Sequence, residues 1–163
     1  MVSAPPLTNH HTTSSRSPFS LEEKVVIQFG GTGHLGRALL AGLLEAGATT
    51  VVASRSQKSV SVATNPAHLP RLNIEEVDIC SEPSLHALRD RVLARHKRVD
   101  GVVFNAVSRP MLRFGDDLSM WQKSMDVNAT GLFATARVFG DVMAARRSGS
   151  MVNIASIQGM VGT

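Results

Sequence analysis

The sequence of 163 residues contains no tyrosine, one tryptophan and one cysteine, and aromatic residues make up only 4% of it. A single cysteine, Cys80, excludes an internal disulfide framework and fits a reducing compartment. No stretch approaches the roughly 18 apolar residues that a membrane-spanning helix needs. The first residues also lack the apolar core of a secretory signal. We therefore expect a cytoplasmic protein with no membrane partner.

The charge pattern does not favour a nucleic-acid partner. The net charge is +4, and the densest basic group, between Arg89 and Arg98, falls in the last turns of a predicted helix. Cations at that position complement the helix dipole. Few aromatic side chains are available to stack on bases. These residues are best interpreted as a solvated helix end.

The first 20 residues are rich in Ser, Thr, Pro and His and show no periodicity, which predicts a disordered tail followed by one domain over residues 21–163. The pair His10–His11 has no second ligand pair at suitable spacing, so no metal site is expected. The tail contains one arginine and no acid before Glu22, which leaves organelle targeting as an open alternative.

Five short, largely apolar segments alternate with helical patterns, which predicts an α/β fold: a doubly wound parallel sheet of Rossmann type with three layers. The segment between Ser54 and Pro70 is expected to be a loop with at most a short helix. Ser81 is expected to start the second helix. The predicted strands are Lys24–Phe29, Thr49–Ala53, Leu72–Val77, Gly101–Phe104 and Ser150–Ala155.

Two of the helices carry apolar stripes at helical spacing. The first stripe comprises Leu35, Leu39, Leu40, Leu43 and Leu44, and Gly47 is placed to end that helix. The second helix with a stripe covers about 118–147. Its apolar residues, from Trp121 to Met143, are expected to form core or an interface between copies of the chain.

A glycine-rich turn follows the first strand and opens the first helix. Gly31–Gly36 fits the pattern G-x-G-x-x-G, and the spacing from Gly30 also fits G-x-x-G-x-x-G. In a βαβ unit, this pattern indicates a dinucleotide site with the pyrophosphate at the helix N-terminus. A tight turn without a ligand is the alternative.

The residues after the second strand bear on which dinucleotide binds. An acid is expected there to accept from the ribose 2′-hydroxyl group, but the sequence has Ser54 and Arg55 instead. These two side chains suit a 2′-phosphate, which favours NADP(H) over NAD(H). A solvated arginine at a strand end is the alternative for Arg55.

Several segments, in the same order and at matching spacings, together resemble the short-chain dehydrogenase/reductase family. Phe29 and His34 depart from that family's usual glycine motif, where a threonine and a glycine are common. The matching segments are Gly30–Gly36, Val77–Ile79, Phe104–Val107, Trp121–Phe133 and Gly149–Ser156.

The resemblance implies a hydride-transfer enzyme that acts on an alcohol or ketone. It implies that Ser156 hydrogen-bonds the substrate oxygen and that Asn128 holds a water in a proton relay. It also places Asp78 near the adenine ring and Asn105 near the cofactor. The full set of residues expected to bind the cofactor is Gly30, Gly31, Thr32, Gly33, His34, Leu35, Gly36, Ser54, Arg55, Asp78, Ile79, Asn105 and Ala106.

The family's Y-x-x-x-K motif, which supplies the general acid/base, would fall beyond Thr163. The chain therefore resembles the N-terminal two-thirds of such an enzyme, a fragment expected to be inactive alone. The strand at Met151–Ile154 would then form an exposed apolar edge. Two alternatives stay open: a non-catalytic NADP(H)-binding module or sensor, and another Rossmann protein such as a methyltransferase. The family usually pairs through its central helices, so a homo-oligomer through 118–147 is a further expectation.

Overall fold

We describe residues 17–56 and 65–156 in a computed structural model of the chain. Most of the expected tail, including the His10–His11 pair, lies outside these residues. Residues 17–20, which we also assigned to the tail, form a turn in which the Ser20 N–H donates to the Ser17 carbonyl at 2.8 Å. No helix among the described residues combines the length and apolar character that crossing a bilayer demands.

The described strands form one parallel sheet in the order β3-β2-β1-β4-β5, which confirms the predicted fold class. β1 lies at the centre and pairs with both β2 and β4, so the strand order reverses there. In such sheets ligands bind outside the carboxyl ends of the strands at this reversal. The strands are β1 (Val25–Phe29), β2 (Thr49–Ser54), β3 (Leu72–Glu76), β4 (Gly101–Phe104) and β5 (Ser150–Asn153).

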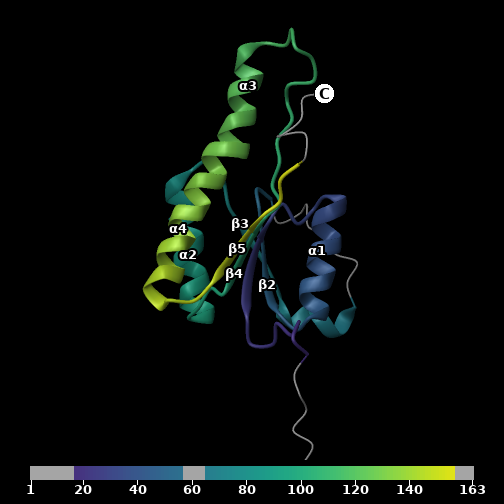
Figure 1. The fold of residues 1–163 in the computed structure, drawn as a ribbon, viewed down its shortest axis with the longest axis vertical. Coiled ribbons are helices and arrows are strands. Elements are labelled where there is room, and N and C mark those ends of the chain that lie inside the picture. The colour runs from purple at the N-terminus through teal and green to yellow at the C-terminus, as the bar shows by residue number, and fades with distance from the viewer. Residues whose placement is uncertain (1–16, 57–64, 157–163) are drawn as a thin grey trace, which may run out of the picture.

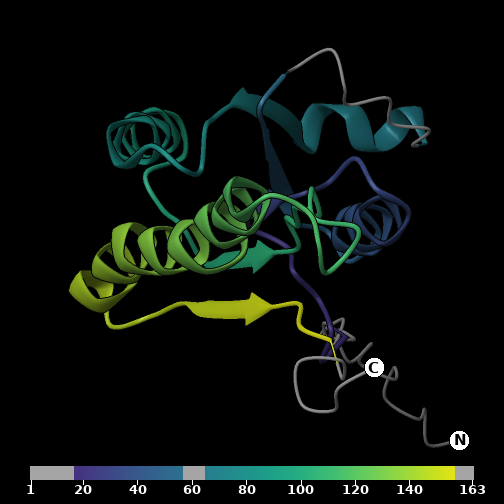
Figure 2. The ribbon, with the colours of Figure 1, turned by 90° about the horizontal axis from the view of Figure 1, so that it is seen from above.

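Helices cover both faces of the sheet (Figures 1 and 2). α1 (His34–Glu45) packs on one face, and α2 (Glu82–His96) and α4 (Leu132–Arg146) pack on the other. Alternate residues of β1 serve the two faces: Ile27 packs toward α2 and α4, whereas Val26 packs toward α1. A short 3-10 helix, η2 (Pro66–Arg71), lies in the segment that we expected to be mostly loop.

The first apolar stripe is only partly buried. Leu40 and Leu44 are fully buried, and Leu39 and Leu43 pack at the edge of the core, as predicted. Leu35, however, is 52% exposed, so the buried part of the stripe does not extend to the start of α1. Gly47, with φ +100°, follows the helix end as predicted.

The helix predicted over 118–147 consists of α3 (Leu118–Met125), a π-helical segment η3 (Asp126–Gly131) and α4. Phe139 and Met143 are buried, but Trp121 and Phe133 are 50% and 65% exposed, so these two are not core. The hydrogen bonds of a π-helix join residues five apart, whereas those of an α-helix join residues four apart. A stripe at α-helical spacing therefore does not keep to one face across η3, which separates Trp121 in α3 from the buried residues of α4.

β5 is the outermost strand of the described sheet and pairs only with β4 there. Its Val152 is 49% exposed, and Ile154 just beyond it is also exposed. The expected apolar edge is thus present. Such an edge is an association site because its backbone groups and apolar side chains face solvent together.

Asp100 joins three strands at the edge of the sheet opposite to their carboxyl ends. Its carboxylate accepts from the Val25 N–H at 2.9 Å and from the Arg98 guanidinium through two bonds of 2.6 Å. Its backbone carbonyl accepts from the Ser150 N–H at 3.0 Å. Burial by itself raises the pKa of Asp100, but the bonds from Arg98 and Val25 outweigh it, so the pKa lies below its ordinary value.

We expect Asp100→Ala to lower the free energy of unfolding at pH 7 by about 2 kcal/mol, because charge-assisted hydrogen bonds in a largely buried site are lost. Since the pKa of Asp100 is depressed in the folded state, the stabilisation is full above the unfolded pKa of about 3.9 and is lost as pH falls through the folded value. Urea unfolding of the wild-type chain and the variant between pH 7 and pH 2 measures both the loss of stability at pH 7 and its dependence on pH. Asp90→Ala, at an exposed pair with Arg89, is the control. An equal loss in both variants would contradict the assignment.

Candidate functional site

The glycine turn between β1 and α1 is shaped by close backbone approaches. Gly30 has φ +77°, a conformation that favours glycine, and a side chain there would come within 2.6 Å of the Asn105 and Ala106 backbone. A side chain at Gly36 would overlap the carbonyl oxygen of Gly30. Glycine at these two positions therefore lets α1 start directly against the carboxyl ends of β1 and β4.

The N-terminus of α1 is left open. Its capping residue, Gly33, provides no side-chain hydrogen bond, and the first turn contains no acidic residue. A side chain at Gly33 would meet no atom within 4 Å, and His34 and Leu35 are exposed. Unpaired N–H groups and the helix dipole make such an end suitable for an anion, provided that other groups complete the site.

Asn105 ties the turn to the neighbouring strand. Its backbone N–H donates to the Phe29 carbonyl at 3.0 Å, and its side-chain amide donates to the Gly30 carbonyl at 3.0 Å. The side chain thus fixes the point at which the chain leaves β1.

A cleft of about 820 Å³ opens above the carboxyl ends of the central strands. Seven of the residues expected to bind the cofactor line it: Gly30, Thr32, Ser54, Arg55, Asp78, Ile79 and Ala106. The other six do not line it. Gly31 and Gly36 are buried, Asn105 is half-buried, and Gly33, His34 and Leu35 are exposed.

Ser54 and Arg55 lie at the β2 end of the cleft. The Ser54 carbonyl accepts from the Val77 N–H at 2.9 Å, and its hydroxyl donates to the Ser56 carbonyl at 2.8 Å. Arg55 is exposed, and among the described residues no carboxylate forms an ion pair with it. It also lines an adjoining cavity of about 690 Å³. The guanidinium is therefore available to an anion in the cleft.

The turn after β3 lines the cleft beside the end of β2, its neighbour in the sheet. The Asp78 carboxylate accepts from the Cys80 N–H at 3.0 Å, and the Asp78 N–H donates to the Ser84 hydroxyl at 3.0 Å. Burial raises the pKa of the Cys80 thiol, and the nearby Asp78 and Asp126 carboxylates raise it further. The thiol is thus neutral near pH 7. Ser81 caps α2 by accepting from the Ser84 N–H at 3.4 Å, as its sequence position predicts.

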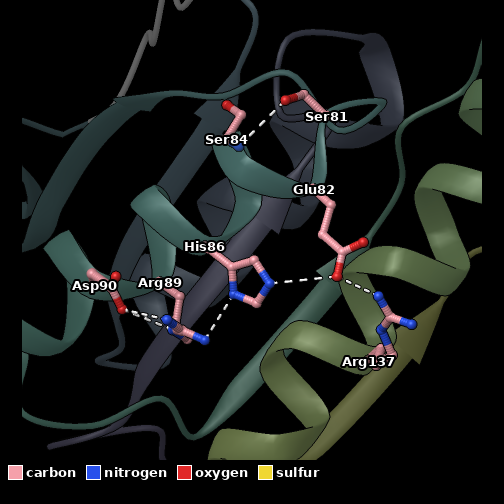
Figure 3. A network of polar contacts seen from close by, with 7 residues as sticks. All are labelled: Ser81, Glu82, Ser84, His86, Arg89, Asp90 and Arg137. Atoms are coloured by element: carbon pink, nitrogen blue, oxygen red, sulfur yellow. Dashed lines mark hydrogen bonds and ion pairs between the residues drawn. The ribbon is translucent and has the colours of Figure 1, made fainter.

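A polar network holds the start of α2 against α4 (Figure 3). Glu82 in the first turn of α2 pairs with Arg137 of α4, and the hydrogen bond from Arg137 lowers the pKa of Glu82. One turn further, Arg89 lies 2.8 Å from Nδ1 of His86. Arginine can only donate, so this nitrogen accepts and neutral His86 carries its proton on Nε2, which faces Glu82.

The two residues expected to be catalytic do not line the cleft among the described residues. The Asn128 amide is taken up by the backbone of Ser108: it accepts from the Ser108 N–H and donates to the Ser108 carbonyl, each at 2.8 Å. Ser124 also donates to that carbonyl, at 3.0 Å. Asn128 therefore anchors the loop after β4. Ser156 is exposed beyond the end of β5.

Sequence reasoning missed part of the cleft wall. Five of these residues lie in segments that carried the family resemblance, but none of the five was assigned to the cofactor site: Val77, Val107, Lys123, Asp126 and Val127. Phe29 and Ala53 fitted apolar strands, and the remaining residues lie in connecting segments where no local pattern marks a ligand contact. The missed residues are Phe29, Ala53, Ser56, Val77, Cys80, Val107, Ser108, Pro110, Lys123, Asp126 and Val127.

Comparison with known proteins agrees with this geometry. Residues 24–163 match the family model for short chain dehydrogenases, so the chain belongs to the short-chain dehydrogenase/reductase family. This family binds nicotinamide cofactors, NAD or NADP. The result confirms the resemblance that the sequence motifs indicated.

The relatives include proteins of different lengths. A 2-dehydro-3-deoxy-D-gluconate 5-dehydrogenase of Pseudoalteromonas atlantica is 34% identical over 85% of this chain and 56% of its own length. A short chain dehydrogenase/reductase of Macrophomina phaseolina is 30% identical over 89% of this chain and 87% of its own. The chain thus spans little more than half of the first relative.

Solved structures show the same fold. A short-chain type dehydrogenase/reductase from Mycobacterium marinum superimposes with a TM-score of 0.78 over 89% of this chain and 60% of its own, at 21% identity. At that identity the likeness supports the fold alone.

Proposed function

We propose that this chain is the nucleotide-binding part of an NADP(H)-dependent oxidoreductase that acts on an alcohol or ketone. The observation that carries this proposal is that Gly30, Thr32, Ser54 and Arg55 line one cleft. The glycine turn suits a pyrophosphate, and the cation at the end of β2 suits a 2′-phosphate where NAD-binding sites have an acid. Dehydrogenases among the relatives support the substrate class.

In this proposal each wall of the cleft binds one part of the cofactor, which supplies the hydride when bound. The turn at Gly30–Thr32 and the open N-terminus of α1 hold the pyrophosphate. Ser54 and Arg55 hold the 2′-phosphate, and Asp78 and Ile79 lie against the adenine. Ala106, which follows β4, lies beside the end of the cofactor that carries the hydride.

The proposed roles of the two catalytic candidates differ. Ser156 follows β5 and would donate a hydrogen bond to the substrate oxygen. Asn128 would act by anchoring the loop at Ser108, because that loop already occupies its amide.

The chain contains no tyrosine, so it lacks the family's usual proton donor to the substrate oxygen. This favours binding without turnover and supports, as a second candidate function, a non-catalytic NADP(H)-binding module. The exposed Trp121 and Phe133 also support an assembly of copies through the helix at 118–147, which sedimentation velocity would measure.

We expect the full chain to enhance NADPH fluorescence in a saturable titration that NADP⁺ reverses, because the cleft accepts the same nucleotide in either redox state. We also expect no NADPH consumption with simple ketones at pH 7, because the sequence contains no tyrosine to act as the proton donor. Binding together with turnover would favour a complete enzyme that uses another proton donor. Absence of binding at millimolar NADPH would overturn both candidate functions.

A further inference from the structure

We propose that Gln28 is a positioning residue for the glycine turn between β1 and α1. Its hydrogen bond holds the first turn of α1 at the distance from β1 that pyrophosphate binding requires. Gln28 is fully buried in the middle of β1, where its neighbours in the strand are all apolar. Its side-chain Nε2 donates to the carbonyl of Gly36 at 2.7 Å. This inference rests on the proposed binding of a dinucleotide.

The orientation of the amide follows from its partner. A backbone carbonyl only accepts, so the nitrogen of Gln28 must face Gly36. The side-chain oxygen then points to the other side, and it has no hydrogen-bond partner among the described residues. It lies under Gly31, 3.6 Å from where a β-carbon on that glycine would stand. The amide thus sits directly beneath the turn.

An amide in this place works against stability. A buried carbonyl oxygen without a partner retains the full cost of its lost hydration. A methionine of nearly the same shape would fill the space without that cost. Gln28 therefore contributes little to the stability of the sheet. Its hydrogen bond to the Gly36 carbonyl indicates that it positions the start of α1.

The hydrogen bond from Gln28 reaches the first turn of α1, next to the glycine turn. Gly36 is in the first turn of α1, where the helix passes closest to Gly30. No side chain caps the helix, and the bond from Gln28 connects β1 directly to this turn. A tether at Gly36 fixes the direction in which the open N-terminus of α1 faces the cleft.

The test compares Gln28→Met with the wild-type chain by titration with two probes, NADPH and adenosine 2′-phosphate. The second probe carries the adenosine and the 2′-phosphate but no pyrophosphate. We expect Gln28→Met to weaken NADPH binding by about fivefold or more, the equivalent of one ordinary hydrogen bond. Binding of adenosine 2′-phosphate should change less than about twofold, because it does not use the turn. The unfolding temperature should be unchanged or higher.

Thr50→Val is the matched control. The Thr50 hydroxyl is equally buried without a partner, but it lies on β2 away from the turn. We expect this change to leave both affinities as they are. Unchanged NADPH affinity in Gln28→Met, or a parallel loss for both probes with a lower unfolding temperature, would overturn the positioning role. Absence of NADPH binding by the wild-type chain would instead overturn the proposed function itself, and this role with it.

Discussion

Replacing Arg55 by alanine is expected to weaken NADPH binding by about 10- to 100-fold while leaving NADH binding nearly unchanged. The size follows from losing a charge-assisted contact to a phosphate, which contributes about 1.5–3 kcal/mol. The selectivity follows because NADH lacks the 2′-phosphate that Arg55 would contact. Fluorescence titration of both cofactors with both proteins gives the four dissociation constants.

Two further variants sharpen the Arg55 result. Arg55→Asp places an acid where NAD-binding sites have one, so the preference should reverse toward NADH. Arg95→Ala removes an exposed arginine from the last turn of α2, far from the carboxyl ends of the strands, and should change neither affinity. An equal loss for both cofactors in Arg55→Ala would show that Arg55 acts through general charge and not through a 2′-phosphate.

Replacing Gly36 by alanine is expected to abolish NADPH binding and to lower the free energy of unfolding by about 3 kcal/mol. The added methyl group would overlap the Gly30 carbonyl oxygen, which belongs to the backbone and cannot turn aside as a side chain would. Relief requires α1 to move away from β1, at the upper end of the usual cost of overpacking. Such a movement would also withdraw the open N-terminus of α1 from the cleft.

Gly42→Ala in the same helix provides the comparison. Gly42 is exposed in the C-terminal half of α1, and a side chain there would meet nothing within 4 Å. The change should therefore stabilise the protein by up to about 1 kcal/mol through helix propensity alone, with unaltered cofactor affinity. Chemical unfolding and NADPH titration of the two variants test this contrast. Similar behaviour of both would mean that the approach of α1 to β1 does not control the site.

Local patterns predicted most of the fold. The strands were found because short apolar runs end at turn residues, and Ser81 and Gly47 marked helix ends through their local chemistry. The order of the strands had no local signal, because it depends on which strands pair across long stretches of chain. Leu35 fitted the helical stripe, yet it is exposed, because spacing shows which residues share a helix face and not how deeply each one is covered.

The part of the site formed by closely packed backbone was predictable. Gly30 and Gly36 stand where a side chain would collide with neighbouring backbone, and glycine at such positions is visible in the sequence. The partner of Asn128, by contrast, is a loop 20 residues earlier in the chain. Asn128 itself lies in the π-helical segment η3, which the α-helical spacing of the sequence did not predict. Gln28 gave no signal, because one amide inside an apolar strand does not interrupt the hydrophobic pattern.

The preference of the wild-type chain between NADPH and NADH, measured by calorimetric titration of the full protein, tests the central claim most directly. If Ser54 and Arg55 bind a 2′-phosphate beside the glycine turn, NADPH should bind about tenfold or more tightly than NADH, at one molecule per chain. NADH binding as tightly as NADPH, or no heat of binding with either cofactor, would contradict the account.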